Sequence, residues 1–393
     1  MRITKILERP VGLHVGSGGD PANAVVNFSS HTVSLVAVFT DVIRAGKPVV
    51  GVAFDSIGRF AQSGILRDRM IPRLAAASHD ALLDASDRID PAAVLACALA
   101  DEKPGGHGDR AVAAAAVELA CWDLNAKLSD EPAYVTIARH FGREPAGTVG
   151  VYAAGGYYYP GAGTRNLDRL RTEMRGYLDL GYDAVKMKIG GASLGDDLRR
   201  IEAVIDIVGA AGRVAVDANG RFDRPTAQQW AAALGGYGLR WYEEPGDPLD
   251  FELNHAVTAC YDGAVATGEN LFSVPDVTNL VRYGGMRPGL DVFQMDAGLS
   301  YGLSEYARML EVLESNGFDR RFAFPHGGHL INLHIAAGLG LGGCESYPGV
   351  FQPFGGYPDG CALSAGRIAP TDAPGFGLEQ KTGLAELIAE LTA

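Results

Sequence analysis

The chain is poor in cysteine, in basic residues and in long apolar runs. Its five cysteines are scattered, odd in number and never in a CxxC spacing, which argues against disulfides or a cysteine zinc site. Lysine and arginine total 34 against 47 acidic residues, so nucleic acid and anionic membrane surfaces are not expected partners. No apolar run approaches the ~20 residues of a membrane helix, and the N-terminus lacks a signal-peptide core. We expect a cytoplasmic protein.

From about residue 148 onward, short apolar strands alternate with amphipathic helical stretches. This alternation predicts a (β/α)8 TIM barrel over residues 146–361. A doubly wound sheet is the alternative fold, but no GxGxxG turn opens a helix. The expected strands are residues 149–156, 184–190, 213–220, 239–245, 264–270, 290–298, 321–328 and 344–349.

Residues 1–145 have a different pattern, which predicts a separate α+β capping domain. Residues 33–56 contain two hairpin strands, and alanine-rich helices follow, ending near residues 111–128. The tail, residues 362–393, is too long for a barrel remnant and is expected to pack back on this domain. Long polar loops are typical of functional sites, and two glycine-rich loops are of this kind: residues 13–27 and 54–64.

Polar side chains stand at the expected strand ends, where a barrel of this type forms its active site. Two of them are lysines in one buried strand, two residues apart, so both side chains point to the same face. From the second strand to the eighth, the residues are Lys186 and Lys188, Asp217, Glu243 or Glu244, Glu269, Asp296, His326 and Glu345.

Three of the acidic residues recur at the interval of one strand–helix unit. Asp217 and Glu243 are 26 positions apart, and so are Glu243 and Glu269. Carboxylates at matching heights on adjacent strands repel one another unless a cation joins them. An all-oxygen ligand set favours Mg²⁺ over Zn²⁺. Each acid alone could be a surface residue or a helix cap, but the common register favours the metal site. Glu243 is preferred to Glu244 because it shares a face with Trp241.

Barrel geometry places the second strand opposite the sixth. A metal on the arc between them leaves the lysines on one side and His326 on the other, so a bound substrate has an acid/base group on each face. Asp296 ends the preceding strand and is placed to orient the histidine ring. Glu345 either hydrogen-bonds the substrate or serves as a cap. His329 and His334 are expected to be packing or solvent residues.

These strand-end residues, with the helix ELACWDLNAKL, resemble the enolase superfamily, mandelate racemase-like subgroup, over nearly the whole chain. The segments EKPGGHG, VYAAGGYYYP, YDAVKMKIGG, ATGENLFS and PHGGH are similar to those of D-tartrate dehydratases in that subgroup. The resemblance implies Mg²⁺, a homo-oligomer, Lys188 as base, His326 as acid and the three carboxylates as metal ligands. It also implies substrate contacts from Asn23, Lys103, Tyr157, Lys186 and Glu345.

The implied reaction is the Mg²⁺-dependent dehydration of a small hydroxy acid, D-tartrate to oxaloacetate. Lys188 must then be neutral; burial and Lys186 lower its pKa, while the carboxylates raise it. Asp55 and Ile57 depart from the pattern, because the tartrate enzymes have Asn at both positions. Three alternatives stay open: a racemase or epimerase, a dehydratase of another acid sugar (an aldarate or aldonate), and a non-catalytic carboxylate-binding barrel.

Overall fold

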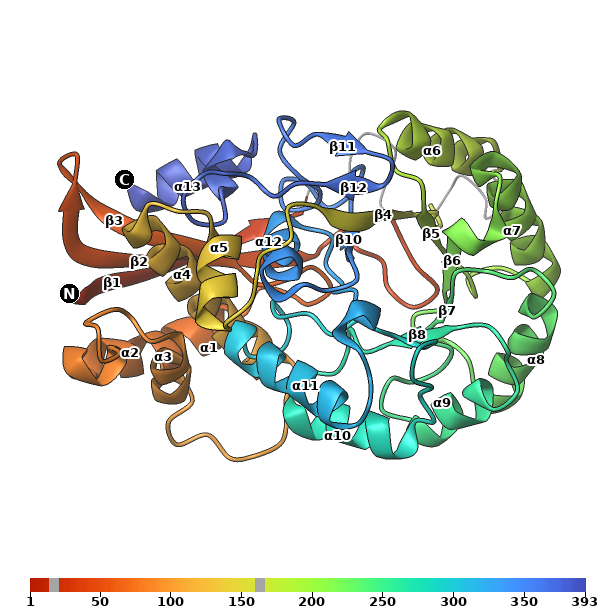
Figure 1. Cartoon of the computed structure of the whole chain (residues 1–393), viewed down its shortest axis with the longest axis horizontal. Coiled ribbons are helices and arrows are strands. Elements are labelled where there is room, and N and C mark those ends of the chain that lie inside the picture. Colours follow the sequence, from red (N-terminus) through yellow and green to blue (C-terminus); the bar gives the residue numbers. More distant parts are fainter. Residues whose placement is uncertain (14–20, 160–166) are drawn as a thin grey trace.

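The computed structural model describes residues 1–13, 21–159 and 167–393. An N-terminal α+β part and a larger barrel lie side by side, with the small sheet at one end of the molecule and a ring of helices at the other (Figure 1). Within the described ranges, no helix combines the length and the apolar character that crossing a membrane requires.

The N-terminal part is a three-stranded antiparallel sheet with helices packed on it. The predicted hairpin is confirmed, since β2 (Thr32–Arg44) pairs antiparallel with both β1 (Ile3–Gly12) and β3 (Lys47–Phe54). The helical segments that follow are α1 (Ser63–Ile65), η1 (Leu66–Met70), α2 (Ile71–Ala76), η2 (His79–Leu82), α3 (Pro91–Ala98), α4 (Asp109–Ser129) and α5 (Ala133–His140).

Helix α4 is the core of this part, and every residue from Ala111 to Ala126 is buried. Its small side chains allow strand β3 to approach the helix backbone closely. A Cβ added at Gly51 would lie 2.1 Å from the carbonyl oxygen of Ala120, so only glycine fits at this crossing. The alanine-rich sequence therefore forms a tightly packed strand–helix layer.

The barrel is built from parallel strands joined by helices, as predicted. From the first barrel strand to the sixth, neighbouring strands pair in chain order, and the last barrel strand pairs with the first. The strands are β4 (Val149–Gly155), β5 (Val185–Lys188), β6 (Val214–Asp217), β7 (Tyr242–Glu243), β8 (Val265–Thr267), β9 (Val292–Phe293) and β10 (Cys344–Ser346).

The strand predicted over residues 321–328 is reduced to one parallel bridge between Phe293 and Ala323. This segment begins with the 3-10 turn η4 (Arg320–Phe322) and runs into a proline and two glycines with positive φ, which cannot continue a ladder. Its carbonyls still accept bonds from the last strand region, Gly342 to Ala323 and Glu345 to Pro325. The seventh position of the barrel is thus present, although shorter than predicted.

Helices surround these strands as an outer ring (Figure 1). Four of them begin at a side chain that accepts a bond from the first turn: Ser193, Asp223, Asp250 and His329 do so for α7, α8, α9 and α12. The helices are α6 (Leu167–Asp179), α7 (Leu194–Val208), η3 (Ala211–Arg213), α8 (Arg224–Leu234), α9 (Phe251–Thr258), α10 (Val274–Tyr283), α11 (Leu303–Ser315) and α12 (Leu330–Leu339).

One buried carboxylate joins the two parts of the molecule. Helix α11 begins at Gly302, which has no side chain to accept its first N–H groups. Glu118 of α4 takes that role, accepting bonds from the backbone of Leu303 (2.8 Å) and Ser304 (3.0 Å) and from Trp122 Nε1 (2.8 Å). This cap holds the N-terminal part in place beside the barrel.

The C-terminal segment divides between the two parts. The hairpin β11 (Leu363–Ser364) and β12 (Arg367–Ile368) extends the barrel sheet next to β4. Farther on, η5 (Leu378–Gln380) and α13 (Leu384–Thr392) lie against the N-terminal part: Phe376 N donates to Asp123 (2.7 Å), and Arg9 pairs with Glu390 (2.5 Å). The domain boundaries at 145/146 and 361/362 stay a prediction.

Candidate active site

A pocket of about 340 Å³ lies between the N-terminal loops and the C-terminal ends of the barrel strands. The barrel contributes Lys188, Glu269 and His326 to its wall. The N-terminal part contributes residues of both glycine-rich loops, among them Asn23 and Ile57. Residues 14–20 of the first loop lie outside the described residues. The pocket therefore combines the strand-end groups with the loops that the sequence marks as functional.

The two lysines of β5 lie at different depths. Lys188 lines the pocket, and its Nζ lies 2.5 Å from Asp217 Oδ2. Lys186 is fully buried below it, where Nζ contacts Glu243 (2.5 Å), Glu345 (2.7 Å) and Asp217 (3.3 Å). Lys186 therefore neutralises the acidic floor, and Lys188 is the amine placed against the pocket.

The lysine charges are held by the carboxylates. Burial alone lowers the pKa of Lys188, but Asp217 and the Tyr157 oxygen raise it, and the net direction is upward. Burial and Lys186 do lower the pKa of Lys188, as expected from the sequence. The short contact with Asp217 raises this pKa by more than they lower it. For Asp217, burial raises the pKa, but Lys188 and Lys186 overcome it and lower the pKa.

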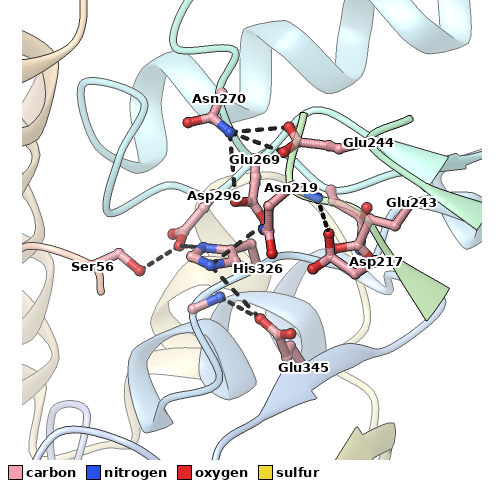
Figure 2. Close-up of polar contacts among 12 residues, drawn as sticks. Ser56, Asp217, Asn219, Glu243, Glu244, Glu269, Asn270, Asp296, His326 and Glu345 are labelled. Carbon is pink, nitrogen blue, oxygen red and sulfur yellow. Dashed lines mark hydrogen bonds and ion pairs between the residues drawn. The ribbon is translucent and has the colours of Figure 1, made fainter. Parts of the chain in front are cut away.

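Asp217, Glu243 and Glu269 form one carboxylate cluster, in which one oxygen from each lies within 4.8 Å of the others (Figure 2). Asp217 and Glu243 are direct partners in the β6–β7 register, as their spacing predicts. Glu269 is not at the same height, because Glu243 pairs with Ala266. Gly268, at φ +125°, turns the chain beyond β8, and the Glu269 side chain returns toward the cluster from the loop.

The cluster fits a hard divalent cation such as Mg²⁺. Burial and the charges of Asp217 and Glu269 raise the pKa of Glu243 to about 8, with Lys186 opposing them, so a further positive charge is favoured here. Among the described residues, Glu269 Oε2 is buried and has no hydrogen-bond partner, and His326 Nε2 lies 3.7 Å from it. An orphaned oxygen of this kind is costly unless something binds it. All-oxygen donors are those that Mg²⁺ prefers.

The neighbouring Glu244 also lines the pocket, but it has a different partner. Its oxygens accept bonds from Asn270 Nδ2 at 3.0 and 3.2 Å, and its backbone has a positive φ of 38° where the chain leaves β7 (Figure 2). Burial, then Glu269 and Asp217, raise its pKa well above the usual range. The observed cluster contains Glu243, the residue chosen from its phase in the strand.

His326 lies at the end of the shortened seventh segment, with a partner on each ring nitrogen. Nδ1 lies 3.3 Å from Asp296 Oδ2, and Nε2 lies 3.7 Å from Glu269 (Figure 2). Nε2 also lies 3.1 Å from the Tyr347 hydroxyl. Burial lowers the pKa of His326, but Glu269 and the Asp296 bond raise it to about 9 overall. Both carboxylates therefore favour the protonated ring, and Asp296 is placed where it can set the ring orientation.

Three residues that the sequence did not single out complete this network. Ser56, from the loop after β3, donates to Asp296 Oδ2 and lies 3.0 Å from His329 Nε2. Asn332 donates to Asp296 Oδ1 (2.9 Å), and Tyr347 contacts His326. Ser56 lies in the second glycine-rich loop, which the sequence predicts to be functional. No local pattern in the sequence predicts its hydrogen bond to Asp296, which is 240 positions away.

The remaining predicted residues divide into two groups. Tyr157 and Asn23 line the pocket; Lys188 Nζ lies 5.3 Å from the Tyr157 ring centre, and Asn23 Oδ1 is bound by the N–H groups of two following valines. Glu345 and Lys186 are buried and paired with each other instead of lining the pocket. Glu345 also accepts a bond from Gly327 N (3.0 Å), which suits the capping alternative.

Lys103 is not among the pocket residues. Its side chain is exposed, and its carbonyl accepts a bond from Arg110 (2.8 Å). Its contact with substrate stays a prediction. His329 and His334 are both buried, which agrees with a packing role and rules out a solvent-facing one.

The two departures in the loop after β3 lie in different surroundings. Ile57 is an apolar residue of the pocket wall. Asp55 is fully buried away from the pocket, where Oδ1 accepts a bond from Ser34 N (2.6 Å) and burial raises its pKa. Of these two positions, only Ile57 can contact a substrate directly.

Replacing Glu269 by glutamine is expected to weaken Mg²⁺ or Mn²⁺ binding by about tenfold or more, because a charged ligand is lost. Titration calorimetry without substrate measures this directly. Glu244→Gln is the matched control and is expected to lose less affinity, because Glu244 is bound to Asn270. An equal or larger loss in Glu244→Gln would instead assign the second ligand to Glu244.

Comparisons with known proteins agree with this geometry. Residues 169–383, more than half of the chain, match the family described as enolase C-terminal domain-like. An arabinonate dehydratase of Saccharolobus solfataricus is 25% identical over 291 residues, covering 72% of this chain and 73% of that protein. An L-talarate/galactarate dehydratase of Salmonella typhimurium is 27% identical over 273 residues, covering 70% of this chain and 64% of that relative.

Solved structures show the same fold. The L-talarate dehydratase of Polaromonas sp. JS666, complexed with Mg and L-glucarate, aligns with a TM-score of 0.77 at 23% identity, covering 98% of this chain and 96% of that chain. A racemase of Streptomyces coelicolor A3(2) with bound magnesium aligns over the full length of both chains, with a TM-score of 0.76 at 20% identity. On its family match, this chain belongs to the enolase superfamily, as a member of the enolase C-terminal domain-like family.

Proposed function

We propose that the protein is a Mg²⁺-dependent hydro-lyase that removes water from a small hydroxy acid, with D-tartrate as the substrate and oxaloacetate as the product. The observation that carries this proposal is one pocket wall that contains an amine, Lys188, an imidazole, His326, and Glu269 of the carboxylate cluster. Asp217, Glu243 and Glu269 are the residues that would hold the metal.

The first step belongs to Lys188, which removes the proton α to the substrate carboxylate. Mg²⁺, when bound, supplies Lewis-acid stabilisation of the negative charge that develops there. Lys188 acts as a base only after losing its own proton. Asp217 opposes that loss at 2.5 Å, and its effect weakens once its charge is shared with a divalent cation. Burial and Lys186 then both lower the pKa of the Lys188 amine.

The second step belongs to His326, which donates its Nε2 proton to the departing β-hydroxyl so that it leaves as water. The C–O bond breaks as the electron pair of the former α C–H bond forms the C=C double bond. The product is an enol, which tautomerises to the 2-oxo acid. Tyr347 contacts the same nitrogen at 3.1 Å, and Asp296 supports the resulting ring from Nδ1.

D-tartrate is proposed as the substrate because the sequence motifs resemble those of D-tartrate dehydratases. The curated relatives named above are dehydratases of arabinonate and of talarate or galactarate, so a longer acid sugar is the nearest alternative substrate. Ile57 bears on this choice, because an apolar residue stands in the pocket wall where the tartrate enzymes have a hydrogen-bonding Asn.

A racemase or epimerase is the second candidate, and the presence of Lys188 and His326 in one pocket favours it equally. In that reaction one residue removes the α-proton and the other returns a proton to the opposite face. The products differ: in D₂O, a racemase yields the deuterated enantiomer or epimer of the substrate, whereas a dehydratase yields a 2-oxo acid.

The test is a screen of the purified protein with Mg²⁺ against tartrate stereoisomers, arabinonate, talarate and galactarate. A dehydratase forms a 2-oxo acid, which a semicarbazide assay detects, and a chelator abolishes it. Accumulation of the enantiomer or epimer instead assigns the racemase or epimerase reaction. Binding of acids without any chemical change would overturn the enzymatic proposal in favour of a carboxylate-binding barrel.

A further inference from the structure

Arg59 is a cation in the pocket wall that the proposed chemistry does not use. It stands in the loop after β3, on the N-terminal side of the pocket, whereas Lys188 and His326 come from the barrel strands. The pocket thus combines reacting groups from the barrel with a guanidinium from the N-terminal part.

Two contacts hold the Arg59 side chain in place. Nη2 donates to Asn270 Oδ1 at 3.0 Å, and the guanidinium lies 5.1 Å from the centre of the Phe272 ring. Asn270 is itself held, because its Nδ2 donates to Glu244 at 3.0 Å, which leaves Oδ1 toward Arg59 (Figure 2 shows Asn270 beside Glu244 and Glu269). A guanidinium ordered in this way loses little conformational freedom when a ligand binds.

Arg59 forms no ion pair within the described residues. Lys188 pairs with Asp217 and His326 with Asp296, but in the described ranges of the chain no carboxylate lies within ion-pair distance of Arg59. The one polar partner that it has among residues 1–13, 21–159 and 167–393 is a neutral amide oxygen, which uses one of five N–H donors. The planar fork of a guanidinium matches a carboxylate through two parallel hydrogen bonds.

We propose that Arg59 binds the second carboxylate of the substrate and so selects hydroxy diacids over hydroxy monoacids. This inference rests on the proposed function. A diacid has one carboxylate at the reacting end and one at the far end, and Arg59 is the uncompensated cation that meets the far one. A primary alcohol in its place accepts one weaker bond and brings no charge, so the guanidinium stays partly unpaired.

The experiment compares pairs that differ only at the terminal carbon: tartrate with threonate, and galactarate with galactonate. Wild type is expected to prefer the diacid of at least one pair. Arg59→Gln is expected to lower kcat/KM for that diacid by about 10- to 100-fold, mostly through KM, with a much smaller effect on the monoacid. Arg59→Lys keeps the charge without the planar fork and is expected to recover part of the loss. Arg224→Gln, at a surface arginine paired with Glu252, is the control.

A binding measurement separates this inference from the proposed reaction. Calorimetry of the Mg²⁺-loaded protein compares succinate with 4-hydroxybutanoate, neither of which has the hydroxyl that dehydration removes. Weaker succinate binding in Arg59→Gln supports the inference even if wild type dehydrates none of the acids. If Arg59→Gln lowers turnover or binding equally for diacids and monoacids, or changes neither, the inference is overturned while the dehydratase proposal stands on its own assay.

Discussion

Lys188→Ala is expected to lower kcat for dehydration by about 10²–10⁴-fold, the range over which a positioned general base contributes to catalysis. Among the described residues of the pocket wall, Lys188 is the one amine, and the proposed mechanism assigns the α-proton to it. The loss should fall on kcat, because the amine acts on the transition state and the metal site holds the substrate.

Two measurements keep this prediction specific. Thermal unfolding and Mg²⁺ titration test whether the variant folds and retains its cation site, which is expected because Lys186 still lies 3.3 Å from Asp217. Lys47→Ala, at an exposed lysine of β3, is the control and should behave as wild type. A folded, metal-binding Lys188→Ala variant that keeps full turnover would remove Lys188 from the mechanism.

His326→Asn is expected to separate the two halves of the reaction. Asparagine keeps a polar side chain but cannot donate the proton that the departing hydroxyl needs, so formation of 2-oxo acid should fall by about 10²–10⁴-fold. Lys188 is untouched, and it should still remove and return the α-proton. Substrate recovered from D₂O is therefore expected to carry deuterium at the α-carbon with its configuration retained.

The same variant distinguishes dehydration from racemisation. If wild type is a racemase, His326→Asn should lose formation of the opposite enantiomer, whereas exchange by Lys188 continues. His255→Asn, at an exposed histidine of α9, is the control for both readouts. Loss of α-proton exchange together with dehydration in a folded His326→Asn protein would contradict the division of roles and assign the base to His326.

The lysine pair shows the limit of reasoning from strand phase. Phase predicts that Lys186 and Lys188 face the same side, and they do share Asp217 as a partner. It does not predict depth along the barrel axis, which decides that Lys186 is enclosed by Glu243 and Glu345 while Lys188 meets the pocket. Lys186 therefore balances charge in the floor, and its contact with substrate stays a prediction.

Local pattern and spacing were enough to predict the barrel, the N-terminal α+β part and the three carboxylates. A parallel barrel repeats one strand–helix unit, so equal spacing along the chain becomes a common position around the barrel mouth. The phase of Glu243 relative to Trp241 follows from the two-residue period of a strand, and Trp241 Nε1 does donate to Glu243 at 2.8 Å. These features depend on short stretches of chain and need no knowledge of distant contacts.

Only the tertiary structure decided which groups reach one another across the pocket. Ser56 meets Asp296, and Arg59 meets Asn270, over more than 200 residues of sequence, and neither contact leaves a local pattern. Glu269 joins the cluster from a loop beyond its strand, although its spacing suggested equal height. The physical reason is that loop conformation depends on packing between the two parts of the molecule, whereas strand and helix periodicity is set by the backbone itself.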